Sequence, residues 1–212
     1  MKLSLLLFAG AALCCSILRA GPVDVFTTLG SGYNAGAGLS VGDGTIAEEG
    51  NSWAIAFTAP STGDPNFDYA LFDIQFAGSD SDVTDEVSVA LYSDSSNLPG
   101  TAEETLHTTL LTTPSVVTVD SILDPVLSPG AQYWIVLSDA NDEATWNSSN
   151  NGLQGVAELP NGGSWTLSSS YSQPGVEVDA IEVAAVPEPG TLLAFGSGLT
   201  ALMLLARRRI RK

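Results

Sequence analysis

Short runs of alternating apolar and polar residues, separated by turn-forming residues, constrain the fold of this chain more than any other feature. Successive side chains of a β-strand point to opposite faces, so WAIAF places Trp53, Ile55 and Phe57 on one face. LFDIQF and VSVALY repeat this pattern, with their apolar faces formed by Phe72, Ile74 and Phe76 and by Val87, Val89 and Leu91. YWIVL, from Tyr133, is apolar on both faces, as expected of a central strand.

Turn sequences separate these runs, and no interior segment keeps a helical period. Examples are STGDPN at 61–66, SDSSNLPG at 93–100, and Asn-Gly at 151–152 and 161–162. In VEVDAIEV the apolar phase switches near Ala180, which indicates a β-bulge. The pattern predicts one all-β domain over residues 21–185, a two-sheet antiparallel sandwich for which we expect a jelly-roll arrangement.

The N-terminus has the pattern of a secretory signal peptide. One Lys precedes an apolar run from Leu3 to Leu18, and Leu18-Arg19-Ala20 follows it, so we expect residues 1–20 to be removed after Ala20. Both cysteines, Cys14 and Cys15, lie in this segment. The remaining domain therefore has no thiol chemistry and no disulfide.

The charged residues are segregated along the chain, whose net charge is −17. All 24 acidic residues lie between Asp24 and Glu188, and no Lys or Arg occurs between Ala20 and Ala206. The middle of the chain cannot form Lys or Arg salt bridges, so its carboxylates must be solvated, hydrogen-bonded or bound to a cation. A surface this negative repels phosphate backbones, which argues against nucleic acid as a partner. Acidity also keeps an exported protein soluble, and both interpretations stay open.

The C-terminal segment predicts a membrane anchor. Thr191 to Ala206 are sixteen uncharged residues, about 24 Å as a helix, somewhat short of the ~20 residues of a usual transmembrane helix. The basic cluster that follows should stay in the cytoplasm and leave the acidic domain outside; it comprises Arg207, Arg208, Arg209, Arg211 and Lys212. A buried core helix is the alternative, but this segment has no polar face.

Val186-Pro187-Glu188-Pro189, followed by a short apolar helix and an arginine cluster, resembles the PEP-CTERM sorting signal of Gram-negative bacteria. The resemblance covers residues 186–212 and implies processing by an exosortase, a membrane-embedded cysteine protease-transpeptidase. Pro187 and Pro189 keep the backbone extended just outside the bilayer, in the form that a protease needs.

The exported part resembles the choice-of-anchor group of bacterial surface domains, and is most similar to choice-anchor R. The resemblance is carried by SGYNAGAGLSVGDG at 31–44, AIAFTAP at 54–60, VSVALYSDSSNLPGT at 87–101, LSPGAQYWIVLSDANDEATWNSSN at 127–150 and GGSWTLSSSYSQPG at 162–175. This group attaches one kind of domain to different anchors, and membership implies no established activity.

The parts of common catalytic sites are missing from the sequence. His107, the only histidine, lies in an alternating segment and is expected to be an exposed strand residue. With no second His and no mature Cys, the sequence lacks the residues for a triad or a zinc site. We therefore expect no enzyme, although a hydrolase acting through paired carboxylates stays an alternative among so many acids.

Two acidic segments could bind calcium, DSDVTDE at 80–86 and DANDE at 139–143, because their oxygen-bearing side chains alternate as in cation loops. We favour Asp139, Asn141 and Glu143 as ligands. Neither segment has the glycine and distal Glu of an EF-hand, and solvated loop acids are the alternative interpretation.

The tryptophans divide into two groups. Trp53 and Trp134 lie in apolar strands and are expected in the core. Trp146 and Trp165 have polar neighbours and are candidate platforms for stacking sugar rings; the alternative is that they cap the ends of the sandwich. The sequence thus predicts an exported, non-enzymatic surface or extracellular-matrix protein. A carbohydrate-binding module for extracellular polysaccharide is the alternative.

Overall fold

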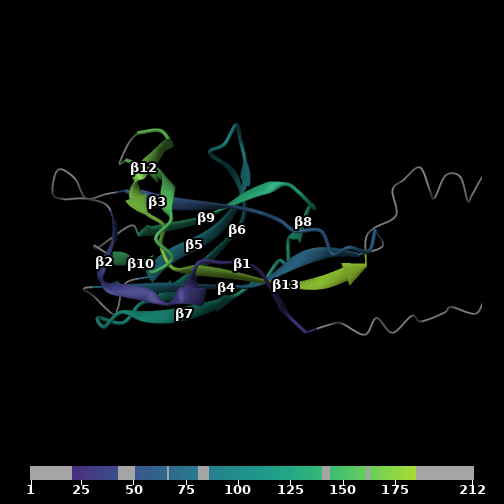
Figure 1. Cartoon of the computed structure of the whole chain (residues 1–212), viewed down its shortest axis with the longest axis horizontal. Coiled ribbons are helices and arrows are strands. Elements are labelled where there is room, and N and C mark those ends of the chain that lie inside the picture. Colours follow the sequence, from purple (N-terminus) through teal and green to yellow (C-terminus); the bar gives the residue numbers. More distant parts are fainter. Residues whose placement is uncertain are drawn as a thin grey trace, which may run out of the picture.

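Two layers of β-strands form the domain (Figure 1). The computed structural model describes residues 21–42, 51–65, 67–80, 86–139, 144–160 and 163–184. Within these residues the secondary structure consists of strands and one short 3-10 helix, Leu29–Ser31. The predicted all-β fold of two antiparallel sheets is confirmed, and its jelly-roll arrangement stays a prediction. The expected signal peptide 1–20 and transmembrane helix 191–206 lie outside the described residues.

The first sheet has seven strands and is built around the long strand β4. Its main path runs in the order β1, β13, β4, β10 and β2, and β7 and β8 also pair with β4. These strands are β1 (Val23–Thr27), β2 (Tyr33–Val41), β4 (Phe67–Asp80), β7 (Ser115–Asp120), β8 (Val126–Leu127), β10 (Ala144–Ser149) and β13 (Val176–Ala184). The first and last strands of the domain are therefore neighbours in one sheet.

The second sheet has six strands, in the order β12, β11, β3, β9, β5 and β6. They are β3 (Ser52–Thr58), β5 (Glu86–Asp94), β6 (Pro99–Thr109), β9 (Gln132–Asp139), β11 (Gln154–Leu159) and β12 (Thr166–Ser172). β9, which contains YWIVL, pairs with β3 on one side and β5 on the other. Its predicted central position is confirmed.

The main core lies between the two sheets. Ile55 from β3 and Phe76 from β4 are fully buried in the same apolar cluster, so side chains of both layers interdigitate there. Phe26 of β1 also stacks on Phe57 of β3, with ring centroids 5.5 Å apart. Period-two alternation correctly predicted this core for WAIAF and VSVALY.

A second, smaller apolar cluster lies on the outer face of the second sheet. It contains Ala54, Trp134, Val136 and Ala157, with Trp165 packed against it. This cluster explains why β9 is apolar on both faces: its odd-numbered residues enter the main core, and its even-numbered residues enter the outer cluster.

A β-bulge interrupts the pairing of β4 and β13. The register passes from Asp73 opposite Asp179 to Leu71 opposite Ala180, so Phe72 is the extra residue on β4. The irregularity expected near Ala180 is confirmed. The prediction that Phe72 shares the core face of Ile74 is wrong, because the bulge leaves its side chain 37% exposed.

Both ends of the described domain lie at the same end of the sandwich. Val23 of β1 pairs with Ala180, and β13 ends nearby at Ala184, toward the right in Figure 1. β2 and β12 lie at the opposite end. Along β4, Phe67 pairs with Ala184 while Gly78 pairs with β10, a separation of about 35 Å at ~3.3 Å per residue. The last described strand, β13, therefore ends at the end of the sandwich opposite β2.

Candidate functional site

Trp146 lies in the main core. Its side chain is fully buried on β10, and its indole N–H donates a hydrogen bond to the carbonyl of Gly175 at 3.2 Å. The prediction that Trp146 is an exposed sugar platform is therefore wrong. Its polar neighbours Asn147, Ser148 and Ser149 misled the sequence interpretation, because they are buried as well. β10 lies between β2 and β4, where neighbouring strands cover polar and apolar residues alike.

Trp165 is half-buried and borders a cavity of about 610 Å³. The cavity lies between the segment before β12 and the hairpin of β5 and β6, and its other walls include Asp94, Leu98, Pro99 and Thr101. An aromatic face beside polar side chains is an arrangement that can stack on and hydrogen-bond a sugar ring. Of the two predicted aromatic platforms, the structure thus places Trp165 beside a cavity.

Asp94 gives this cavity a fixed wall. Its Oδ1 accepts hydrogen bonds from Nε1 of Trp134 at 2.9 Å and from Nε2 of Gln132 at 3.0 Å. Its Oδ2 accepts one from the backbone N–H of Asn97 at 3.2 Å, in a turn where Ser96 and Asn97 adopt left-handed φ values of 58° and 63°. The carboxylate therefore ties the turn to β9, so the cavity wall is preformed.

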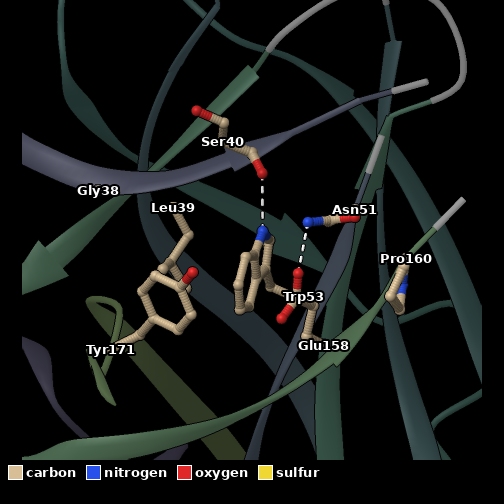
Figure 2. Close-up of a pocket in the computed structure, with 8 residues that line it drawn as sticks. All are labelled: Gly38, Leu39, Ser40, Asn51, Trp53, Glu158, Pro160 and Tyr171. Atoms are coloured by element: carbon tan, nitrogen blue, oxygen red, sulfur yellow. Dashed lines mark hydrogen bonds between the residues drawn. The ribbon is translucent and has the colours of Figure 1, made fainter. Parts of the chain in front are cut away.

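A second cavity, of about 530 Å³, lies at the β2 end of the sandwich (Figure 2). Trp53 and Tyr171 meet edge to face in it, with ring centroids 4.8 Å apart. The Trp53 indole N–H donates to the carbonyl of Ser40 at 2.7 Å, and Nδ2 of Asn51 donates to Oε1 of Glu158 at 2.6 Å. These polar groups already have partners within the protein, so this cavity is less prepared to bind a ligand than the one beside Trp165.

The structure describes only part of the predicted calcium site. Asp139 is the last residue of β9 and is mostly buried, whereas Asn141 and Glu143 lie outside the described residues. This calcium site stays a prediction. His107 is exposed on β6, as expected, and its Nδ1 lies 3.0 Å from Oγ of Ser88. The sorting motif 186–189 and the basic cluster 207–212 also lie outside the described residues.

A row of carboxylates crosses the outer face of the first sheet, and the sequence interpretation missed it. Asp179 on β13 lies opposite Asp24 on β1 and opposite Asp73 on β4, which in turn lies opposite Asp120 on β7. Four adjacent strands thus present one acid each at the same level. Alternation in LFDIQF and VEVDAIEV does place acids on the outer face, but only strand pairing and register bring them together.

The electrostatics of this row are unfavourable for charged carboxylates. Burial is the main cause that raises the pKa of Asp179 to about 7, and the neighbouring acids Asp24, Asp73 and Glu177 contribute to the same rise. Burial also raises the pKa of Asp73, with Asp120 and Glu177 adding repulsion. Since the domain contains no Lys or Arg, only a proton or a bound cation can relieve this repulsion.

In the described part of the chain, no helix has the length and apolar character needed to span a membrane. No curated protein matches the chain. Residues 185–209, however, match the PEP-CTERM protein-sorting motif. The matched range contains the predicted Pro-Glu-Pro and the first three arginines of the basic cluster. The chain therefore carries a sorting motif that marks exported proteins for processing by exosortase and for association with the membrane or cell surface.

Proposed function

We propose that this protein is a non-enzymatic component of the cell surface or extracellular matrix. The match of residues 185–209 to the PEP-CTERM motif is the observation that carries the proposal. In this proposal the segment 191–206 crosses the membrane, the basic cluster 207–212 stays inside, and the β-sandwich faces the exterior. Exosortase then cleaves near 186–189. The resemblance to choice-of-anchor domains agrees with this role.

The described geometry supports a non-catalytic role. The Ser88–His107 contact lies on two strands of a sheet with His107 exposed, and neither residue borders the two cavities described above. Asp94 beside Trp165 is engaged in three hydrogen bonds, as expected of a structural carboxylate rather than of a general acid or base.

Intact mass of the protein recovered from exosortase-containing cells tests the proposal. We expect a species that lacks residues 1–20 and has lost the basic cluster Arg207 to Lys212. A Pro187→Ala/Pro189→Ala variant should keep the tail, because the segment before the membrane is then free to become helical. A wild-type product that retains Lys212 would rule out processing.

A second candidate function is binding of extracellular polysaccharide, and the cavity beside Trp165 favours it. Trp165→Ala should abolish retention on a polysaccharide matrix prepared from the producing cells. Leu167→Ala is the matched control, because Leu167 is 63% exposed on the neighbouring β12 and does not line the cavity. Equal retention of the two variants, or no retention of the wild type, would exclude this candidate.

A further inference from the structure

Three carboxylates come together where β1 meets β13. Asp24, Glu177 and Asp179 each offer one oxygen, and these oxygens all lie within 4.8 Å of one another. Ligand oxygens lie about 2.3–2.6 Å from calcium, so two ligands of the same ion can be up to about 5 Å apart. The cluster therefore has the dimensions of a calcium coordination shell with the ion between its three side chains.

Local irregularity in β1 creates this cluster. The register of β1 and β13 shifts between Asp24 and Phe26, so that Phe26 lies opposite Val178 and Asp24 opposite Asp179. Without the shift, Val25 would lie opposite Asp179. The bulge thus lets Val25 and Phe26 pack against the core while the Asp24 carboxylate joins the outer face.

Two hydrogen bonds hold the other carboxylates in place. Oγ1 of Thr27 donates to Oε2 of Glu177 at 2.7 Å, and Nε2 of Gln75 donates to Oδ2 of Asp179 at 3.0 Å. Each donor comes from a neighbouring strand and occupies one oxygen of its partner. In both carboxylates this orients the side chain and leaves the second oxygen available for a ligand.

The burial of carboxylate oxygens that have no hydrogen-bond partner is an independent observation that favours a cation here. Asp179 is 7% exposed and Asp73 is 6% exposed, and Oδ1 of each is buried with no hydrogen-bond partner among the described residues. Burying a carboxylate oxygen without a partner is costly, and here two such groups face each other. The chain offers no basic side chain to compensate, because Lys and Arg are absent between Ala20 and Ala206.

We propose that Asp24, Glu177 and Asp179 bind a calcium ion, with Asp73 adding negative charge from the adjacent strand. The all-oxygen ligand set selects a hard cation over zinc or copper. Asp24 is exposed, so water has access to complete the six to eight ligands that calcium takes. The site is distinct from the segment 139–143, which the sequence had favoured.

Calcium at this position would join the first and last strands of the domain. β13 ends at Ala184, and the sorting motif begins at the next residue. An ion shared by β1 and β13 would strengthen the strand through which the folded domain is connected to its anchor. Extracellular calcium modules bind with dissociation constants of about 10⁻⁴–10⁻³ M, the range that we expect here.

Calorimetric titration and thermal unfolding of the full chain in mild detergent, with CaCl2, MgCl2 or EDTA, test the site. We expect millimolar calcium to raise the Tm by about 5 °C over EDTA, and magnesium to do so less. Asp24→Asn, an exposed change that leaves folding intact, should weaken calcium binding about tenfold or more. Asp179→Asn should remove the Tm response.

Glu103→Gln is the matched control, because it removes one exposed charge on β6 and should keep the full calcium response. Asp139→Asn separates this site from the segment 139–143. The proposal is overturned if the wild type binds no calcium at millimolar concentration, or if Asp24→Asn and Glu103→Gln respond alike. It is also overturned if binding is lost in Asp139→Asn and kept in Asp24→Asn.

Discussion

Asp73 on β4 and Asp179 on β13 lie directly opposite each other, and both carboxyls are buried on the outer face of the first sheet. Like charges in this position destabilise a strand pair. Their neighbours on the flanking strands are Asp24 and Asp120, so the surroundings add further negative charge. The pair therefore couples the stability of this sheet to pH and to cations.

Metal-free protein should lose stability as the pH rises from about 4 to about 7. Burial and, secondarily, the neighbouring acids raise the pKa of Asp179 from an ordinary 3.8 to about 7, so the folded state keeps a proton that the unfolded state releases. The stabilisation is fully present below pH 3.8 and is lost as the pH passes 7. The groups that face Asp179 from the neighbouring strands and from β13 itself are Asp24, Asp73, Glu177 and Gln75, and Asp120 lies one strand farther away, opposite Asp73.

Urea unfolding in EDTA at about pH 4.5 and about pH 7.5 measures this effect. Asp179→Asn should be more stable than the wild type at the higher pH and should show a smaller change between the two pH values, because its amide does not ionise. Glu103→Gln again serves as the control. An identical pH dependence in wild type and Asp179→Asn would contradict the assignment.

The alternation of apolar and polar residues predicted the strands well, because it indicates which face of a strand is buried. WAIAF and YWIVL behave as expected, since both lie in the interior of a sheet with regular register. Alternation failed at Phe72, where a bulge adds a residue that the local sequence does not mark. It also failed at Trp146, because polar neighbours can be buried between strands.

The acidic row could not be predicted from the sequence. Its members are far apart in the chain, and only the strand order β1, β13, β4, β7 and the register shift at Asp24 bring them to one level. The sequence did leave a bound cation open as one way to accommodate these acids, because the domain has no Lys or Arg. The sequence could not indicate that such a cation would lie on this row, since acidic residues occur throughout the domain.

Trp146 and Trp165, for which the sequence predicts the same role, should differ sharply in the effect of truncation to Ala on stability. Trp146→Ala removes a fully buried ring and the hydrogen bond to Gly175, so we expect a loss of about 3–5 kcal/mol in unfolding free energy. Trp165→Ala removes a half-buried ring at the edge of the small outer cluster and should cost clearly less. Urea denaturation gives both values. A smaller loss for Trp146→Ala would contradict its place in the core.

Glu104 should prove to be a structural carboxylate. It is buried on β6 and accepts hydrogen bonds from Oγ of Ser121 at 2.6 Å and from the backbone N–H groups of Ile122 and Leu123 at 2.7 Å and 2.8 Å. Glu104→Ala leaves these donors without their acceptor, so we expect a loss of about 2–3 kcal/mol by urea unfolding. Glu103→Ala, at the exposed neighbouring position, should change stability little, and equal losses would refute the assignment.

Any side chain at Gly38 should destabilise the protein, because β2 and β10 approach closely there. A Cβ at this position would meet Cγ2 of Thr145 at 2.5 Å and the carbonyl oxygen of Trp146 at 2.7 Å. Gly38→Ala must push the two strands apart, and we expect a loss of about 1–3 kcal/mol together with altered Trp53 fluorescence, since Ser40 on the same strand accepts the Trp53 indole hydrogen bond. Gly36→Ala is the matched control, because its nearest contact, Oδ1 of Asn34, lies at 3.5 Å. If the two alanine variants unfold at the same urea concentration, the conclusion that β2 and β10 leave no room for a Cβ at Gly38 is contradicted.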